Sequence, residues 1–388
     1  MKFYKNVEIA NKYGVSQVTV VKWVQDGKDN KNNLQVDSFN NKIRVIDNEH
    51  NHAELTRLAV DGKKYRTGVS HKKTQPNKDF YDIFDLEEQI EIINDLRYRQ
   101  EVNLKFYYKN GGAKMWDDEY KNSGSQMLST TQTILQNTIN DLKYLITDKN
   151  INLIDMGCGN GYHTRLLLDK LNISRYIAVD ISKEMVEICK NNVKSWQPNL
   201  EFSEYICDIE SSRFGKIFLD NHTSDVSNLV LFTGGTICNT NDRVRILKNF
   251  ASGLLSEDVL VFNYTLDSIE NRSEFKYVSD SEEDRKRAWI LSSFGIDVVD
   301  CEVEIAFDPN THSKVKYLVL DKDYTISFSL NNKIEEVILR KGQKIVRWKH
   351  FLLTHSLILD ELNQANLEVN FLKQIDNHSL IGVKLKTL

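Results

Sequence analysis

The stretch that decides the fold is residues 151–164, Ile-Asn-Leu-Ile-Asp-Met-Gly-Cys-Gly-Asn-Gly-Tyr-His-Thr. It begins as an apolar strand and reaches Asp155 before a turn that carries a glycine at every second position. These glycines are Gly157, Gly159 and Gly161. Glycine at such positions lets a ligand press against the backbone where any Cβ atom would collide with it. The stretch therefore predicts a strand that ends in a ligand-binding turn.

The segments after the turn complete the pattern. An amphipathic run over residues 165–171 predicts a helix, and a second apolar strand over 176–179 ends at Asp180. A carboxylate at this distance from the glycines is placed to hold the hydroxyls of a ribose. Strand, glycine turn, helix, strand and acid together predict a Rossmann-like α/β core with a nucleoside site.

Two nucleoside cofactors compete for such a site. A dinucleotide fingerprint requires G-x-G-x-x-G, but here the third glycine comes one place early and Tyr162 holds the expected position. Asp155 also suits a cationic amino-acid group better than a pyrophosphate. The pattern D-x-G-x-G-x-G resembles motif I of S-adenosylmethionine (SAM) methyltransferases. We therefore expect SAM as the cofactor, because a purely structural domain without a ligand explains the glycines poorly.

Later segments arrive in the order that a SAM site requires. Residues 204–209 end in Asp208 and Ile209, which are placed to contact the adenine with an acid and an apolar side chain. An apolar strand over 227–232 then leads into a second glycine turn. The expected cofactor-binding residues are Asp155, Gly157, Gly159, Gly161, Asp180, Ile181, Asp208, Ile209 and Gly234.

Composition sets the broad class of protein. The 388 residues leave room for two or three domains, and 40% hydrophobic with 27% charged residues is ordinary for a soluble globular protein. We see no signal-peptide pattern and no run near the roughly 20 apolar residues of a membrane span. The five cysteines are scattered without a C-x-x-C pair, which argues against a disulfide framework and a zinc site. We expect a cytoplasmic protein with no metal and no membrane partner.

Charge is distributed unevenly along the chain. Residues 1–73 contain 14 Lys or Arg against 8 Asp or Glu, a net charge of +6, whereas the remainder has a net charge of −10. A basic N-terminal module on an acidic body predicts that a polyanion would meet the N-terminus first.

The N-terminal residues 6–28 resemble the helix-turn-helix of bacterial and phage DNA-binding proteins. We expect a turn at residues 13–16, with Ser16 capping a second helix over 17–25 that ends at Asp26-Gly27. Ala10, Val15, Val20 and Trp23 are spaced to fill the angle between the helices. Residues 42–46 are expected to form a wing strand, and 53–65 a packing helix.

Outward positions of the second helix leave two interpretations open. Gln17, Thr19 and Lys22 are tentative DNA-binding residues, because Gln and Lys can contact base edges or phosphates. Val18 and Val21 are also expected to face outward, and exposed apolar residues more often pack on protein. The alternative to DNA binding is therefore a module that docks or dimerises.

Further strings resemble the histidine-specific Nα-methyltransferase family of ergothioneine biosynthesis. They are Thr-Arg-Leu-Leu-Leu-Asp at 164–169, Phe-Thr-Gly-Gly-Thr-Ile-Cys-Asn at 232–239, Ala-Phe-Asp-Pro at 306–309 and Lys-Gly-Gln-Lys-Ile at 341–345. The resemblance covers about residues 105–388. It implies a Rossmann core with a smaller α+β domain inserted late in the chain and the substrate bound between them.

The resemblance and the patterns together divide the chain. The expected parts are a winged-helix-like helix-turn-helix module over 1–70, a linker over 71–80, a helical lid region over 81–150, the methyltransferase core over 151–270, the inserted α+β substrate domain over 271–355, and a terminal helix and hairpin over 356–388. Strands are expected in the insert at 299–307, 315–321, 324–330 and 334–339. The terminal hairpin would use 367–371 and 380–385.

Some residues of the family's binding site have a match in this chain, and others are replaced. Gly157, Gly159, Asp180, Asp208 and Gly234 match cofactor positions of the family, and Asn239 matches an asparagine that holds the acceptor. His163 replaces a family lysine, and Trp348-Lys349-His350 replaces the Glu-x-Ser that holds the amino group of histidine. Without a buried carboxylate the ammonium of a free amino acid would stay unpaired, so free histidine is a poor candidate.

The expected substrate residues are therefore Asn239, Trp348 and His350, and the catalytic residue stays unassigned. His163 and His350 have two interpretations, a base that titrates near neutrality or a histidine held in a hydrogen-bond network. The three prolines are each followed by Asn, which excludes the Pro-Pro and Pro-Cys motifs of DNA base methyltransferases.

Three functions remain open. The first is SAM-dependent N-methylation of a small molecule or peptide other than free histidine. The second is a SAM-binding, DNA-associated regulator with little activity. The third is a methyltransferase that its N-terminal module recruits to nucleic acid or protein.

Overall fold

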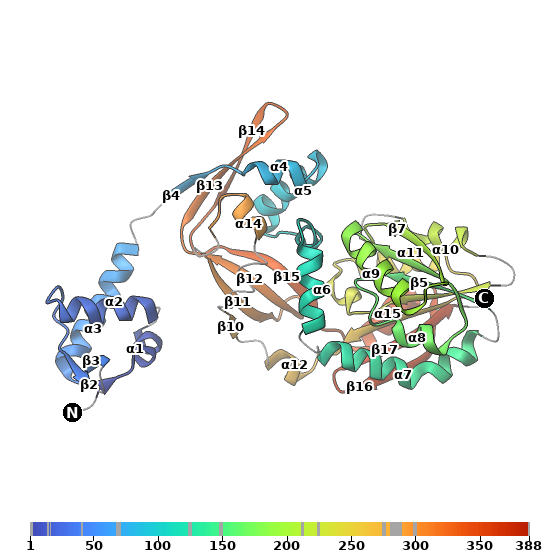
Figure 1. Cartoon of the computed structure of the whole chain (residues 1–388), viewed down its shortest axis with the longest axis horizontal. Coiled ribbons are helices and arrows are strands. Elements are labelled where there is room, and N and C mark those ends of the chain that lie inside the picture. The colour runs from blue at the N-terminus through green and yellow to red at the C-terminus, as the bar shows by residue number, and fades with distance from the viewer. Residues whose placement is uncertain are drawn as a thin grey trace. The chain divides into compact units, whose positions relative to one another are not determined.

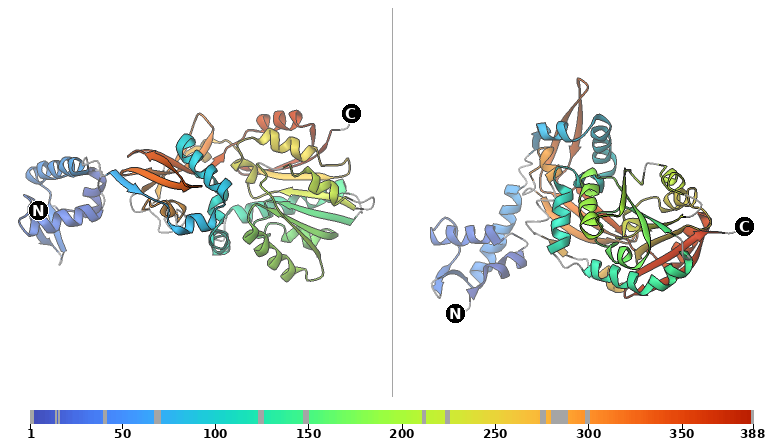
Figure 2. Two further views of the ribbon diagram at one scale, coloured as in Figure 1. Left: turned by 90° about the horizontal axis from the view of Figure 1, so that it is seen from above. Right: turned by 45° about the vertical axis from the view of Figure 1, so that its right-hand side comes forward.

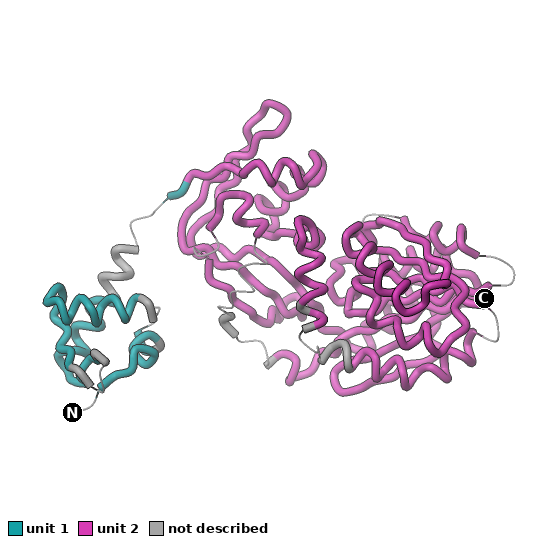
Figure 3. The backbone as a smooth tube through the Cα atoms, in the orientation of Figure 1, with its two compact units in different colours: residues 1–72 teal, residues 73–388 magenta. Residues whose placement is uncertain are grey.

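The computed structural model describes residues 3–13, 15, 17–39, 42–66, 71–122, 126–146, 150–210, 213–222, 226–273, 277–279, 289–297 and 301–386. The chain divides into two compact units, residues 1–72 and residues 73–388 (Figure 3, teal and magenta).

The first unit contains helices on a small antiparallel sheet. Its elements are β1 (Phe3–Tyr4), α1 (Asn6–Tyr13), α2 (Gln17–Lys28), β2 (Val36–Phe39), β3 (Lys42–Ile46) and α3 (Glu49–Arg66), with the sheet order β1-β3-β2. Ala10, Val20 and Trp23 are buried in its core, as their spacing predicted. Ser16, the expected cap of α2, lies outside the described residues.

The expected end of α2 is wrong. The helix runs through Gly27 to Lys28 rather than stopping at Asp26-Gly27. A Cβ atom at Gly27 would lie 3.0 Å from both the Asn32 side chain and the Leu34 Cβ. Glycine therefore stands here because the following segment folds back closely against the helix, not because it terminates the helix.

The second unit is built on a seven-stranded sheet in the order β16-β17-β9-β8-β5-β6-β7 (Figure 1). The parallel strands are β5 (Asn150–Met156), β6 (Ile173–Asp180), β7 (Glu201–Ile206), β8 (Val226–Phe232) and β9 (Val259–Thr265). The terminal strands β16 (Leu367–Ile375) and β17 (His378–Leu385) form the expected antiparallel hairpin, with β17 against β9. This is a Rossmann-like α/β core, and β5 is the middle one of its five parallel strands.

Helices cover both faces of this sheet (Figure 2). They are α7 (Gln126–Ile146), α8 (Arg165–Lys170), α9 (Lys183–Trp196), α10 (Gly215–Asp220), α11 (Arg243–Ala251) and α15 (His355–Gln364). The neighbours Leu153 and Ile154 of β5 belong to opposite apolar clusters, because successive strand side chains point to opposite faces. Both faces are thus buried, as the continuous apolar run of β5 predicts.

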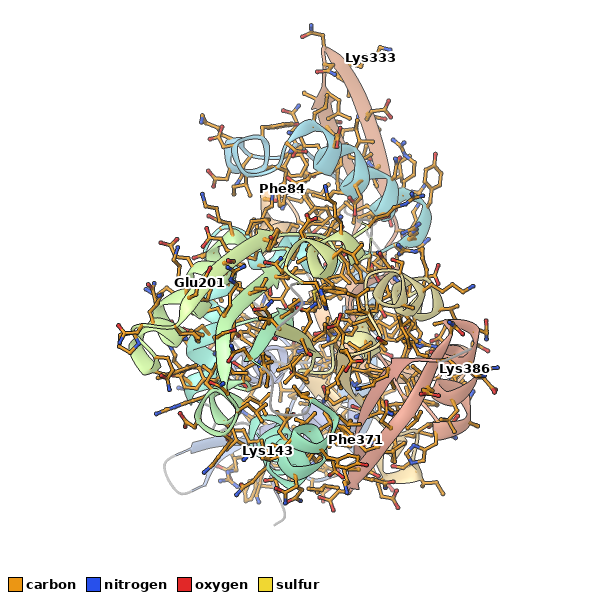
Figure 4. All side chains as sticks on the ribbon, turned by 90° about the vertical axis from the view of Figure 1, so that its right-hand side faces the viewer. Phe84, Lys143, Glu201, Lys333, Phe371 and Lys386 are labelled. Carbon is orange, nitrogen blue, oxygen red and sulfur yellow. The ribbon has the colours of Figure 1, made fainter. Side chains whose placement is uncertain are left out.

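A second lobe interrupts the core between β9 and α15. One sheet has the order β10-β11-β12-β15, from β10 (Tyr277–Ser279), β11 (Cys301–Asp308), β12 (Ser313–Leu320) and β15 (Lys344–Phe351). The other has the order β14-β13-β4, from β4 (His71–Thr74), β13 (Asp323–Leu330) and β14 (Lys333–Leu339). Lys333 marks the tip of the β13–β14 hairpin, which projects away from the core (Figure 4). Strands β11 to β14 were expected from the sequence, whereas β10 and β15 were not. The expected linker over 71–80 is wrong in part, because its first residues form β4.

Helical segments earlier in the chain complete this lobe. They are α4 (Lys78–Ile83), α5 (Leu86–Asn94), the π-helix η1 (Asp95–Arg99) and the 3-10 helix η2 (Leu104–Tyr108), with α12 (Ile269–Ser273) and α14 (Trp289–Ser293) later in the chain. Phe80, Ile92 and Phe106 share one apolar cluster with Phe294 and Phe328. Helix α6 (Gly112–Asn122) then leads back to the core, where Asn160 donates a 2.9 Å hydrogen bond to Asp117 of α6.

Among the helices that the structure describes, none is both long and apolar enough to cross a membrane. Within the same residues, no group of three or more His, Cys, Asp or Glu side chains is placed to hold a metal ion.

Candidate functional site

The glycine turn after β5 has the left-handed backbone that its sequence suggests. The φ angles of Gly157, Gly159 and Gly161 are +70°, +52° and +75°. A Cβ atom at Gly159 would lie 3.3 Å from the Trp116 ring, and one at Gly161 would lie 3.0 Å from the Cys189 sulfur. These glycines thus allow both the turn itself and close packing of protein side chains against it.

Asp180 closes the turn from the end of β6. One carboxylate oxygen accepts a 3.2 Å hydrogen bond from the Gly159 N–H, and the other accepts a 3.0 Å bond from the Ser182 N–H. Its residue exposure is only 9%, and this burial raises the pKa of Asp180 to about 6 despite the backbone donors. Ile181, the next residue, is partly buried. The predicted ribose-binding acid therefore touches the glycine turn directly.

Asp155 is fully buried next to this turn. One of its oxygens accepts a hydrogen bond from the Tyr176 hydroxyl, and the other lies 3.0 Å from the His163 Nε2. Both oxygens of the predicted cofactor residue thus have protein partners. His163, which replaces the family lysine, is only 7% exposed and belongs to this network.

The predicted adenine residues come after β7. Asp208 accepts a 2.9 Å bond from the Glu210 N–H, and its second oxygen lies 3.3 Å from the Lys105 Nζ. Lys105 also lies 2.7 Å from Glu91, so it joins the second lobe to the cofactor side of the core. Ile209 packs against the core cluster. The sequence did not indicate Lys105 as a partner of Asp208.

The second glycine turn comes after β8. Gly234 has φ +80°, and no atom lies within 4 Å of the position that a Cβ atom would take. Just before it, the Thr233 hydroxyl is buried without a hydrogen-bond partner among the described residues. An open glycine beside an unsatisfied hydroxyl is a place where a ligand can approach the backbone.

Asn239 and His350 meet at the acceptor side. The Asn239 Oδ1 lies 3.1 Å from the His350 Nδ1, and the Thr265 hydroxyl lies 2.9 Å from the His350 Nε2. Because the amide oxygen only accepts, we assign the ring proton to Nδ1, so that Nε2 accepts from Thr265. Burial lowers the pKa of His350 to about 3, with further lowering by Lys314 and His378. His350 is therefore neutral and held in a network.

A small cleft opens beside this network, between the core and the second lobe. Its walls include Glu101, Glu210, Asn239, Arg347, Trp348 and Lys349. The Trp348 ring stacks on His350, with ring centres 5.4 Å apart, and so shapes one wall. Asn239 and Trp348, two of the expected substrate residues, thus line the same cleft. His350, the third, contacts both of them.

Sequence reasoning missed the two carboxylates of this cleft. Glu210 comes directly after Asp208 and Ile209, so its proximity to the predicted adenine residues was a usable signal. Glu101 is distant in sequence from every motif and gave no signal. The tentative DNA-binding residues lie on α2 of the other unit, where Lys22 is exposed and Thr19 is partly buried. The Gln17 side chain is outside the described set.

This fold and site define a class of Rossmann-like α/β proteins with a glycine turn suited to a nucleoside, and comparison with known proteins gives the family. A family model described as histidine-specific, SAM-dependent methyltransferase matches residues 88–369. The match covers most of the chain, and the chain belongs to this family. It is accordingly a SAM-dependent methyltransferase enzyme by family, with SAM as its cofactor.

Other known proteins are more distant. A malonyl-[acyl-carrier protein] O-methyltransferase of Acetivibrio thermocellus is 31% identical over 135 residues, which are 34% of this chain and 42% of that protein. The chain thus spans less than half the length of this curated relative. A solved SAM-dependent methyltransferase from Clostridium acetobutylicum matches 78% of this chain and 100% of its own, at 14% identity and a TM-score of 0.41. A glycopeptide N-methyltransferase in complex with SAM matches 64% of this chain and 92% of its own, at 11% identity and a TM-score of 0.35.

Proposed function

We propose that this chain transfers the methyl group of SAM to an amine nitrogen of a small molecule or peptide other than free histidine. The observation that carries the proposal is the composition of the cleft wall on β15. Trp348 and Lys349 line the cleft where the family's Glu-x-Ser would hold the amino group of histidine. Trp348 stands where the family's Glu would be, so no carboxylate at that position pairs with an ammonium, and the neighbouring Lys349 adds a positive charge to the cleft wall.

The residues around the glycine turns fit SAM. Gly157 and Gly159 would contact the amino-acid part of SAM, and Asp180 would bind its ribose hydroxyls. Asp208 and Ile209 would contact its adenine. Gly234 would border the space through which the methyl group is transferred. SAM supplies the electrophilic methyl group, so the chain has to orient the acceptor lone pair and exclude water. The acceptor amine has to lose its proton before it attacks the methyl group, and exclusion of water would favour its uncharged form.

Two measurements test this function. Calorimetry with SAM and with its demethylated product should detect binding. Methyl-labelled SAM should then transfer label to small molecules of a cell extract, while free histidine at millimolar concentration should stay unlabelled. Labelling of histidine at a rate equal to that of the extract would contradict the proposed acceptor class.

For the first unit we propose a helix-turn-helix that contacts DNA through α2. Two helices followed by an antiparallel hairpin and a third helix support this proposal, as does the exposed Lys22 on α2. Val21 on the same helix is 54% exposed, which instead favours a protein contact. Binding to a random duplex that weakens steeply with salt would support DNA over a protein partner.

A further inference from the structure

The cleft beside Asn239 contains a carboxylate, Glu101, whose place the backbone fixes. Val346 of β15 donates its N–H to the Gln100 carbonyl at 2.7 Å, and Val102 donates to the Val346 carbonyl at 3.0 Å. Gln100 itself has the left-handed φ of +54°. These contacts hold Glu101 opposite β15, at the level where Arg347 to Lys349 form the cleft wall.

Glu101 differs from the other acid of the cleft in its partners. The Glu210 carboxylate accepts a 3.0 Å hydrogen bond from the Asn241 N–H. Within the described part of the chain, the Glu101 carboxylate has neither a hydrogen bond nor an ion pair. Burial raises the pKa of Glu101, and Asp95 and Glu210 add to this, whereas Lys349 and Arg99 oppose it. A partly desolvated carboxylate without a partner is costly until a positive group pairs with it.

The cations of the same cleft face aromatic rings. The Arg347 guanidinium lies 5.5 Å from the centre of the Tyr107 ring, and the Lys349 Nζ lies 5.7 Å from that of Phe351. His350, behind Trp348, stays neutral and adds no positive charge. Lys349 acts on Glu101 through its charge but makes no ion pair with it in the described part of the chain, so the Glu101 carboxylate can still bind a positive group of a ligand directly.

We propose that Glu101 binds a positively charged group of the acceptor other than the nitrogen that receives the methyl group, and that the acceptor is therefore an organic cation. The inference rests on the proposed function and assigns the specificity of the same site. It places the ammonium anchor on the segment before η2, rather than on β15 where the family carries it. An acceptor without a positive charge would leave Glu101 unpaired, which discriminates strongly against neutral and anionic molecules.

The test separates candidate acceptor molecules by their charge before the methyl-transfer reaction. A small-molecule extract is split on a cation exchanger, and each pool is incubated with methyl-labelled SAM and the full chain. We expect label in the retained, cationic pool. Glu101→Gln should lower transfer at limiting acceptor at least ten-fold and leave SAM affinity unchanged. Glu304→Gln, on β11 and ion-paired with Lys344, is the matched control and should behave as wild type.

A second variant with a shorter acidic side chain separates the loss of the negative charge from a general structural effect of the substitution. Glu101→Asp keeps the charge and should retain more transfer than Glu101→Gln. Equal activity of Glu101→Gln and wild type, equal loss in both variants, or label confined to the unretained pool would overturn the role of Glu101. SAM binding without label in either pool would instead overturn the proposed methyl transfer, and the inference with it.

Discussion

At the scale of single residues, Asp180 combines a ligand-binding position with a high cost of ionisation. Its pKa of about 6 means that the carboxylate gains a proton as the pH falls through 6, and the protonated form accepts ribose hydrogen bonds poorly. We expect the dissociation constant for SAM to rise about ten-fold per pH unit below pH 6. Calorimetry from pH 5 to pH 8 measures this change.

Asp180→Asn supplies the matched comparison. It should weaken SAM binding by roughly 10- to 100-fold at pH 7, since a charged hydrogen-bond partner contributes about 1.5–3 kcal/mol. The change in affinity with pH should be smaller than in wild type. The raised pKa also means that the ligand-free fold loses stability as the pH rises from about 4 to 6, so the variant should unfold at a higher temperature at pH 7. Affinity in wild type that does not vary with pH would contradict this role for Asp180.

His350 titrates in the opposite sense. Its folded pKa of about 3 lies below its ordinary value of 6.5, so its contribution to stability is present above pH 6.5 and declines as the pH falls toward 3. Between pH 6.5 and 5, wild type should lose about 2 kcal/mol of unfolding free energy relative to His350→Gln. Urea titrations of both proteins at the two pH values measure the difference. A constant difference would mean that folding leaves the pKa of His350 at its ordinary value.

The sequence predicts a site residue well when residues nearby in the chain determine its position. Gly159 and Asp180 belong to one strand-turn-helix-strand pattern, and the structure brings them within 3.2 Å. Asn239 could be placed at the acceptor side because it comes after the second glycine turn. Glu101 reaches the cleft only because an unrelated segment bridges to β15, and a single sequence carries no signal for such a long-range pairing.

At the scale of elements, α6 lies over the glycine turn and gives Gly159 a second reason to be glycine. Gly159→Ala meets both the left-handed φ and the Trp116 ring. We expect at least a ten-fold loss of SAM affinity, since a side chain in this conformation costs about 1–2 kcal/mol before any clash. The double variant Gly159→Ala with Trp116→Ala removes the ring and should restore thermal stability in part without restoring SAM affinity. Full recovery of affinity would show that the glycine serves α6 and not the cofactor.

Strand β15 shows why one element escaped prediction. Its buried positions are Ile345, Arg347 and His350, and two of these three are polar. The pairing of β12 with β15 also shifts register between Lys316 and Tyr317, which interrupts the regular alternation of side chains between the two faces of the sheet. A strand that buries polar residues for a binding cleft lacks the apolar period that identifies strands β11 to β14.

At the scale of the whole molecule, the chain separates into units with their own cores. Val20, Val45 and Leu55 are fully buried within residues 1–72, whereas the clusters of the second unit draw only on residues beyond 72. The compact basic unit and the acidic methyltransferase unit are therefore expected to fold independently.

This independence predicts the outcome of removing residues 1–70, which leaves β4 intact. Residues 71–388 should unfold cooperatively, bind SAM with an affinity within about two-fold of the full chain, and transfer label to the same extract pool, because every residue proposed for the site lies beyond 72. Binding to a random duplex should disappear with the truncation, and Lys22→Gln in the full chain should weaken it with a smaller dependence on salt. Calorimetry, label transfer and a gel-shift salt series measure these three properties. Loss of SAM binding in the truncated chain, with its fold intact by circular dichroism, would mean that the basic unit belongs to the cofactor site, and the two-unit interpretation would be wrong.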